Sequence, residues 1–312
     1  MNYREGSEKD IPAIIDLLKA SLGESRTPKS EQLWKWKHCA NPFGKSPILI
    51  AEEGEEIIGL RTFLRWEFTL QNKIISAVRA VDTAVHPAHQ GKGIFKNLTL
   101  DLIDRMKHEG VDLIYNTPNS KSLPGYLSMG WTKYGKLPLK LKFTLTPTRK
   151  GSRTHVADWN EVSGLLSKIE AEEKSLNHVQ TSLVKGYLTW RYASCPLFPY
   201  SFISDGATYL LVYRVVESKM GRELRLVDLF TLEDFGKMES KQLNSRLNVV
   251  QKEESARFTS FSGLNYPRQK AIQLGSLPAM AIGPTVTLKQ MESSWDPQNL
   301  PWNWSLGDLE VF

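Results

Sequence analysis

The chain has 312 residues, of which 41% are hydrophobic and 24% charged, a composition typical of a soluble globular protein with room for two domains. Its 40 lysines and arginines exceed its 34 acidic residues by six, a dispersed excess that suits a polyanionic ligand and does not indicate a nucleic-acid-binding protein. With two cysteines and no apolar run of membrane-spanning length, the sequence excludes a disulfide scaffold and a membrane protein, and it predicts a cytoplasmic location.

The N-terminal part of the chain predicts helices followed by a meander of strands. Asp10 can cap a helix that begins at Ile11-Pro12, because proline is tolerated in the first helical turn. A second helix is expected over residues 31–44, where Trp34 and Trp36 are expected to pack in the core. Strands are expected at residues 48–51, 57–63 and 74–85.

The end of the last of these strands carries the strongest functional signal. His86-Pro87 ends the strand, and Gln90-Gly91-Lys92-Gly93 then leads into an amphipathic helix that begins near Ile94. Glycines allow a close backbone approach, and a helix start presents unpaired N–H groups at the positive end of its dipole. The spacing fits neither the Walker sequence nor the dinucleotide fingerprint. The stretch therefore predicts an anion-binding loop of another kind.

The run VHPAHQGKGIF resembles the pyrophosphate loop of the GNAT acetyltransferase superfamily, whose pattern is Gln/Arg-x-x-Gly-x-Gly/Ala. Gln90 and Gly93 occupy the first two fixed positions, while Phe95 stands where glycine or alanine is usual, so the packing at the helix start must differ. The opening YREGSEKDIPAIIDLL is also similar to the usual start of a GNAT domain. The resemblance implies that acetyl-CoA is bound by the loop residues Gln90, Gly91, Lys92, Gly93, Ile94 and Phe95.

The resemblance covers residues 1–146 and extends to the expected chemistry. Downstream of the loop helix we expect a strand at residues 111–115, a helix at 123–129 and a closing strand at 137–145. Similarity to GNAT domains implies that the backbone amides of Ala84 and Val85 polarise the thioester and that Asn119 contacts the pantetheine arm. It also implies that Tyr126 protonates the departing thiolate. The alternative for Tyr126 is a core tyrosine that donates to a backbone carbonyl.

After a linker at residues 146–153 the chain repeats itself. WKHCANP, which begins at Trp36, is answered by WRYASCP at Trp190, and RAVD at Arg79 is answered by RLVD at Arg225. These offsets are 190 − 36 = 154 and 225 − 79 = 146 residues. The second copy has Glu and Asp within residues 232–236, where the first copy has its glycine loop, and like charges repel a phosphate.

We therefore expect an α/β protein of two tandem GNAT-like lobes, each a twisted, mostly antiparallel sheet flanked by helices. Residues 1–146 are expected to form the acetyl-CoA-binding catalytic domain, and residues 147–312 a degenerate domain that completes the acceptor pocket. Trp302 and Trp304 near Asp308 could stack on a sugar-like acceptor, but packing between the lobes is the favoured interpretation.

The base that accepts a proton from the acceptor amine is open between three carboxylates. Asp82 lies just before Ala84, although its counterpart Asp228 in the second copy favours a structural role. The terminal carboxylate of Phe312 is a second candidate, because some multi-lobed GNAT relatives return their C-terminus to the active site. Glu67 is a third and weaker candidate. No cysteine or histidine cluster predicts a metal site.

The expected function is transfer of the acetyl group of acetyl-CoA to a primary amine of a small molecule. An aminoglycoside, an amino sugar, a polyamine and an amino-acid-like amine all remain open as acceptors. One alternative is a non-catalytic acyl-CoA sensor or scaffold. Another is an aminoacyl-tRNA-dependent transferase, against which the glycine loop and the lack of a strongly basic run both argue. No nucleic-acid or membrane partner is expected, and the oligomeric state is open.

Overall fold

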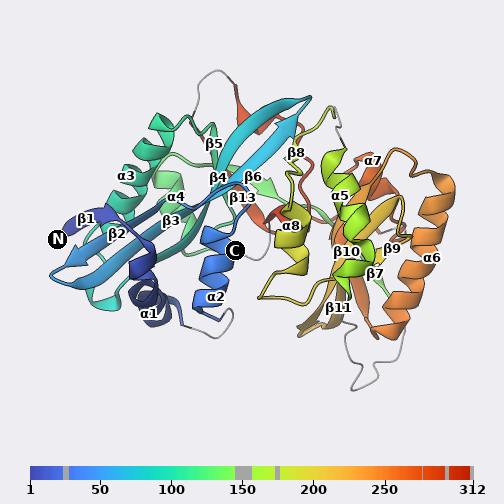
Figure 1. Cartoon of the computed structure of the whole chain (residues 1–312), viewed down its shortest axis with the longest axis horizontal. Coiled ribbons are helices and arrows are strands. Elements are labelled where there is room, and N and C mark those ends of the chain that lie inside the picture. Colours follow the sequence, from blue (N-terminus) through green and yellow to red (C-terminus); the bar gives the residue numbers. More distant parts are fainter. Residues whose placement is uncertain (24–27, 145–156, 173–175, 276, 292–294, 310–312) are drawn as a thin grey trace.

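The protein is built from two mixed sheets, each flanked by helices, as Figure 1 shows. The computed structural model describes residues 1–23, 28–144, 157–172, 176–275, 277–291 and 295–309. Within them, no helix is both long and apolar enough to cross a membrane. The expected α/β class, with two helix-flanked sheets, is confirmed.

The first sheet contains the predicted meander and the central strand. Its order is β1 (Asn2–Glu5), β2 (Ile48–Glu53), β3 (Glu56–Leu70), β4 (Lys73–Val85), β5 (Leu113–Asn116), β13 (Thr285–Gln290) and β6 (Thr132–Lys136). A short strand, β8 (Gln180–Thr181), pairs with the end of β3. Only β4 and β5 are parallel among these pairs.

Helices cover both faces of the first sheet. Alternate residues of a strand point to opposite faces, and the apolar side of α3 (Ile94–His108) packs on the face that carries Leu49 and Ile58. On the other face, α1 (Ile11–Leu22) packs on Ile50 and Ile57 through its buried apolar residues, among them Ile14, Ile15 and Leu18. The remaining helices of this lobe are α2 (Glu31–Trp34), which continues as a π-helix over Lys35–Cys39, and α4 (Leu123–Ser128).

The second sheet has the order β7 (Leu139–Phe143), β12 (Phe258–Ser262), β11 (Gly221–Thr231), β10 (Tyr209–Ser218) and β9 (Ser201–Ser204). Its helices are α5 (Ser163–Ala171), α6 (Lys237–Glu253), α7 (Pro267–Lys270) and the single turn α8 (Leu306–Leu309), with a second π-helix at Thr189–Ala193. The two π-helices begin 154 residues apart, at Lys35 and Thr189, the offset of the repeated tryptophan motif.

The two sheets exchange one strand each. β7, the first-half strand expected to close the first sheet, pairs instead with β12, whereas β13 from the end of the chain pairs with β5 and β6. In Figure 1, β13 lies in the left half with the strands of the first sheet, and β7 lies in the right half with the strands of the second sheet. The strand expected at residues 137–145 was therefore placed in the wrong sheet, and β6 was missed. A boundary at residue 146 divides the chain but does not divide the sheets.

Each sheet contains a bulged strand that diverges from a parallel neighbour. Leu60 pairs with Ala84 and Thr62 with Val81, so Arg61 faces both Asp82 and Thr83, and Asp82 has a positive φ of 39°. β4 pairs with β5 only as far as Arg79. In the second sheet the register shifts beside Asp228, and β11 pairs with β12 only as far as Arg225. Both lobes thus have an opening beyond the last parallel pair.

Candidate acetyl-transfer site

The opening beside β4 is a cleft of about 1030 Å³. The bulged segment from Arg79 to Val85 forms one wall, and the start of α3 and the loop before α4 form the others. Among the described residues, Phe198 is the only lining residue from the second half of the chain. The cleft brings together most of the predicted site residues: Asp82, Ala84, Val85, Gln90, Gly91, Gly93, Ile94, Phe95, Asn119 and Tyr126.

The glycine loop has the backbone geometry that an anion-binding turn requires. Gly91 and Gly93 both have φ near +78°, a conformation that other residues adopt only under strain. Gly93 precedes α3 and offers no capping side chain, so the first N–H groups of the helix are left for a ligand. The side chain of Gln90, an exposed residue, donates through its amide to the Val85 carbonyl at 3.3 Å. Lys92 does not line the cleft and approaches His89 instead.

Phe95, the departure from the usual loop pattern, packs against the other side of the cleft. Its ring meets the Tyr126 ring edge-on at 5.8 Å, and a Cβ on Gly125 would lie 3.3 Å from it. A large residue at the start of α3 is therefore accommodated by a glycine at the facing position of α4. This contact fixes the ring of Tyr126 beside the loop.

Tyr126 is almost fully buried, and its hydroxyl oxygen accepts a hydrogen bond from Nη1 of Arg61 at 2.9 Å. The core-tyrosine alternative required donation to a backbone carbonyl, and no such bond is made by Tyr126 within the described chain. Arg61 was missed in the sequence, since it sits in an apolar strand without a motif around it. The bulge on β4, which brings Arg61 and Thr83 together, has no local sequence signature.

Asp82 lies in an ion-pair cluster at the cleft wall. Its Oδ2 accepts from Nζ of Lys37 at 2.6 Å and contacts Nε2 of His38 at 2.9 Å, and Nδ1 of His38 contacts Oγ of Ser46 at 2.9 Å. Burial raises the pKa of Asp82, but the Lys37 charge and the His38 hydrogen bond outweigh burial and hold that pKa below the usual range. A carboxylate held in this way is a weak base, which favours the structural interpretation of Asp82.

Comparison with known proteins identifies the lobe that holds this cleft. The family model described as an acetyltransferase (GNAT) domain matches residues 2–134. Residues 2–134 are a GNAT domain. The matched range contains the whole glycine loop, the bulged strand and Tyr126, which are the parts that form the cleft.

Relatives of the GNAT domain and of the whole fold agree with this assignment. An L-methionine sulfoximine/L-methionine sulfone acetyltransferase of Salmonella typhimurium is 25% identical over 153 residues, or 44% of this chain and 84% of that protein. A conserved Enterococcus faecalis V583 protein of unknown function superposes with a TM-score of 0.68 at 10% identity, covering 93% of this chain and 72% of that one. Saccharomyces cerevisiae N-myristoyltransferase with bound myristoyl-CoA superposes with a TM-score of 0.53 at 11% identity, covering 92% of this chain and 82% of that one. The last two likenesses extend over both lobes and concern the fold.

The remaining predicted residues of the GNAT site have clear positions. The side-chain oxygen of Asn119 accepts from the backbone N–H groups of Lys121 and Ser122, so it shapes the loop before α4 while lining the cleft. Phe312 lies outside the described residues. The end of the described chain nevertheless contacts a lining residue, because Arg79 donates to the carbonyls of Asp308 and Leu309 at 2.8 and 2.6 Å. Within the described chain there is no group of three or more metal-ligating side chains.

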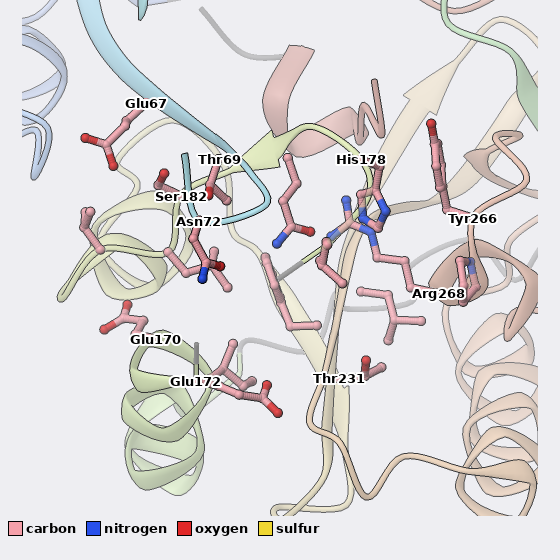
Figure 2. A pocket seen from close by; sticks show the side chains of 18 of the residues that line it. Glu67, Thr69, Asn72, Glu170, Glu172, His178, Ser182, Thr231, Tyr266 and Arg268 are labelled. Atoms are coloured by element: carbon pink, nitrogen blue, oxygen red, sulfur yellow. The ribbon is translucent and has the colours of Figure 1, made fainter. Parts of the chain in front are cut away.

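A second cavity, of about 530 Å³, lies at the corresponding opening of the second sheet (Figure 2). Its wall includes Leu229 to Thr231, which are 146 residues beyond Thr83 to Val85. Figure 2 shows Glu67 and Ser182 on one side and His178, Tyr266 and Arg268 on the other. Glu67, the third base candidate, therefore lines this cavity and is not among the residues that line the cleft of the GNAT domain.

This second opening lacks the phosphate-binding geometry of the GNAT domain. The helix that follows β11 in the chain, α6, begins after Gly236, which has a negative φ of −121°. The Glu239 carboxylate accepts from the N–H of Gly236 at 3.0 Å, so an internal anion occupies the helix start. The Glu172 carboxylate accepts a hydrogen bond from the N–H of Glu233 at 2.9 Å. Arg268 forms an ion pair with Asp228 at 3.4 Å. The expected loss of the phosphate site from the second lobe is consistent with this arrangement.

Proposed function

We propose that this protein transfers the acetyl group of acetyl-CoA to a primary amine of a small molecule. In this proposal residues 1–146 bind acetyl-CoA and catalyse the transfer, while residues 147–312 are a degenerate copy that completes the acceptor pocket. The observation that carries it is the single cleft that joins the glycine loop, the diverging end of β4 and Tyr126. The acetyltransferase relative and the acyl-CoA-bound structural neighbour support the same reaction class.

The protein groups have distinct roles in this transfer. The loop amides hold the pyrophosphate, and the backbone of Ala84 and Val85, which lies beyond the last β4–β5 pair, polarises the thioester carbonyl. The amine nitrogen attacks that carbonyl, the carbon–sulfur bond breaks, and Tyr126 gives its proton to the sulfur. The base remains open between the Phe312 carboxylate, a water molecule and Asp82, with Asp82 weakened by its ion pairs.

Amino-acid-like amines are the first acceptors to test. The Salmonella relative is named for acetylating L-methionine sulfoximine and L-methionine sulfone, both of which carry an α-amino group. Phe198 lines the cleft from the second half of the chain, and the carbonyls of Asp308 and Leu309 accept hydrogen bonds from Arg79, another lining residue; both contacts support an acceptor pocket completed by the second half. Polyamines and amino sugars belong in the same screen.

Binding and turnover of acetyl-CoA test the proposal directly. A ligand at about one hundred times its dissociation constant stabilises the folded state by ~2.7 kcal/mol, so acetyl-CoA should raise the melting temperature clearly. Gly93→Asp should abolish the rise, because it adds a strained, negatively charged residue at the loop. Gly206→Asp is the matched control, because Gly206 also has a positive φ of +79° and open space around a Cβ but lies in the turn between β9 and β10.

Turnover separates catalysis from mere binding. Release of free thiol should require both acetyl-CoA and an amine, and it should fall strongly in Tyr126→Phe. If acetyl-CoA binds but no amine causes thiol release, the sensor alternative is supported. The pairing of Asp82 with Lys37 and His38 also favours that alternative. Equal melting temperatures with and without millimolar acetyl-CoA would reject both functions.

A further inference from the structure

We infer that Arg61 is a positioning residue for the proposed acetyl transfer: it orients the Tyr126 hydroxyl toward the cleft and stabilises the negative charge left on that oxygen. The inference rests on the proposed function and adds a residue that the loop pattern does not contain. Arg61 is fully buried and is not among the residues that line the cleft. It would act through Tyr126 and would not touch a substrate.

The first observation is the direction of the hydrogen bond. A guanidinium group has donors only, so Tyr126 Oη must accept the bond from Nη1 at 2.9 Å. The hydroxyl hydrogen then has to point elsewhere, and within the described chain it has no acceptor. Because Tyr126 lines the cleft, this hydrogen is left for a group bound there.

The second observation is that the Arg61 charge has no carboxylate partner within the described chain. Its guanidinium carbon lies 4.7 Å from the ring centre of Phe63, 5.4 Å from Tyr126 and 5.8 Å from Phe95, and Nη1 also donates to Oγ1 of Thr83. Nε and Nη2 are buried without a hydrogen-bond partner in the described chain. A buried, unneutralised cation is costly for a fold. Such a charge is available to a neighbouring oxygen that becomes negative.

The transfer step provides that negative oxygen. As the carbon–sulfur bond of the thioester breaks, the electron pair stays on sulfur, and the sulfur takes the proton from Tyr126 Oη. The phenol becomes a phenolate, and the amine nitrogen gives up one proton to the base as it becomes an amide. The phenolate regains a proton from the solvent after the thiol leaves, and no oxidant or reductant is required. The bond from Arg61 Nη1 then joins two opposite charges, and such bonds are shorter and stronger than neutral ones. Arg61 therefore contributes more to the transition state than to the resting state, as catalysis requires.

The bulge on β4 explains why Arg61 can reach this position. Arg61 faces the two residues Asp82 and Thr83 across the strand pair, and Thr83 Oγ1 shares the Nη1 donor. Phe63, two residues along the same strand, lies on the same face, and its ring packs against the guanidinium. The bulge that opens the cleft thus also fixes the residue behind Tyr126.

A double-mutant cycle on kcat tests the inference in the full chain. Arg61→Met should lower kcat about tenfold to one hundredfold when Tyr126 is present, while KM for acetyl-CoA changes little. This loss is smaller than the roughly 10²–10⁴-fold that a general acid itself contributes, because Arg61 acts only through Tyr126. In a Tyr126→Phe background the same substitution should change kcat less than about threefold, since the oxygen it serves is gone. Arg61→Lys, which keeps a charge but loses the planar fork, should restore part of the activity.

The outcomes separate this inference from the proposed function. Each variant is first checked for an acetyl-CoA-dependent rise in melting temperature, and Arg61→Lys serves if Arg61→Met does not fold. If the wild-type protein turns over, and the Arg61 substitution lowers kcat by the same factor with Tyr126 present and in the Tyr126→Phe background, the role of Arg61 is overturned. The proposed acetyl transfer would stand. No wild-type turnover with any amine would overturn the proposed function and this inference together. Loss of kcat only in the presence of Tyr126 supports the inference.

Discussion

Trp36 and Trp190 donate hydrogen bonds to each other's backbone. Nε1 of Trp36 donates to the Trp190 carbonyl at 2.8 Å, and Nε1 of Trp190 donates to the Trp36 carbonyl at 2.8 Å. Their rings stack at 5.0 Å with an angle of 19° between the planes. Each tryptophan belongs to a π-helix of its own half of the chain. The two copies of the repeated sequence motif therefore contact each other in an almost symmetrical way.

Trp36→Phe and Trp190→Phe should destabilise the protein to similar extents. Each change removes an indole N–H and its 2.8 Å bond to the facing carbonyl, a net loss of about 0.5–1.5 kcal/mol beyond the lost packing. The double variant should lose less than the sum, because the two rings contact each other. Urea unfolding monitored by circular dichroism measures these changes. Trp34→Phe is the matched control, since its buried Nε1 has no partner in the described chain; a loss as large as that of Trp36→Phe would contradict the role of the paired bonds.

Stability should fall as the pH drops below the ordinary pKa of histidine, and His38 should account for part of the fall. Burial lowers the pKa of His38 below 6.5, against the opposing hydrogen bond to Asp82. Above pH 6.5 both folded and unfolded states hold a neutral His38, so its contribution is fully present. Below that pH the unfolded state takes up the proton first, and stability is lost by at most about 1.4 kcal/mol per pH unit. His38→Gln should flatten this part of the curve between pH 7 and 5; an unchanged slope would show that His38 is not the group responsible.

Asp82→Asn should destabilise the protein by more than the loss of a surface ion pair would. The substitution leaves the ammonium of Lys37, which is 6% exposed, without its carboxylate, and breaking a buried pair in this way costs about 3–5 kcal/mol. Guanidinium unfolding gives the value. Glu31→Gln, which breaks the solvent-exposed pair with Lys35 on the preceding helix, should have no measurable effect. If Asp82→Asn instead retained full stability and lost only kcat, Asp82 would be assigned as the base.

Residues 1–146 expressed alone should not form a stable domain. Their sheet lacks β13, which separates β5 from β6, and β7 would have no β12 to pair with. Size-exclusion chromatography and circular dichroism should show an aggregated or poorly structured fragment, and co-expression with residues 147–312 should restore a folded complex. A monomeric, cooperatively unfolding fragment that binds acetyl-CoA would show that the exchanged strands are dispensable.

Much of the first lobe could be predicted because its signals are local. Proline after a strand, glycines before an apolar helical stripe, and a second proline before Tyr126 each determine backbone geometry within a few residues. The tryptophan motif was also informative, since its repeat offset of 154 residues is the offset of the two π-helices. Trp302 and Trp304 stack at 4.3 Å and are buried, which confirms the packing interpretation.

The features that could not be predicted depend on partners far away in the sequence. β7 and β13 are short strands with similar patterns, and alternation sets which face is buried but not which sheet a strand joins. Arg61 and Arg65 look alike in one strand, yet Arg61 is fully buried under aromatic rings and Arg65 is partly exposed beside Glu109. The cluster of Lys37 and His38 with Asp82 likewise joins residues about 45 positions apart.

The strand exchange also sets the order in which the chain can fold during synthesis. β1 to β5 leave the ribosome within the first 116 residues, but β13, their neighbour, begins at residue 285 of 312. The edge of β5 therefore stays unpaired until residues 285–290 have been synthesised, and such edges are prone to pair with other chains. A nascent chain of this protein is exposed to aggregation while all the residues between β5 and β13 are made, so its yield in a cell should depend on chaperones that cover an open strand edge.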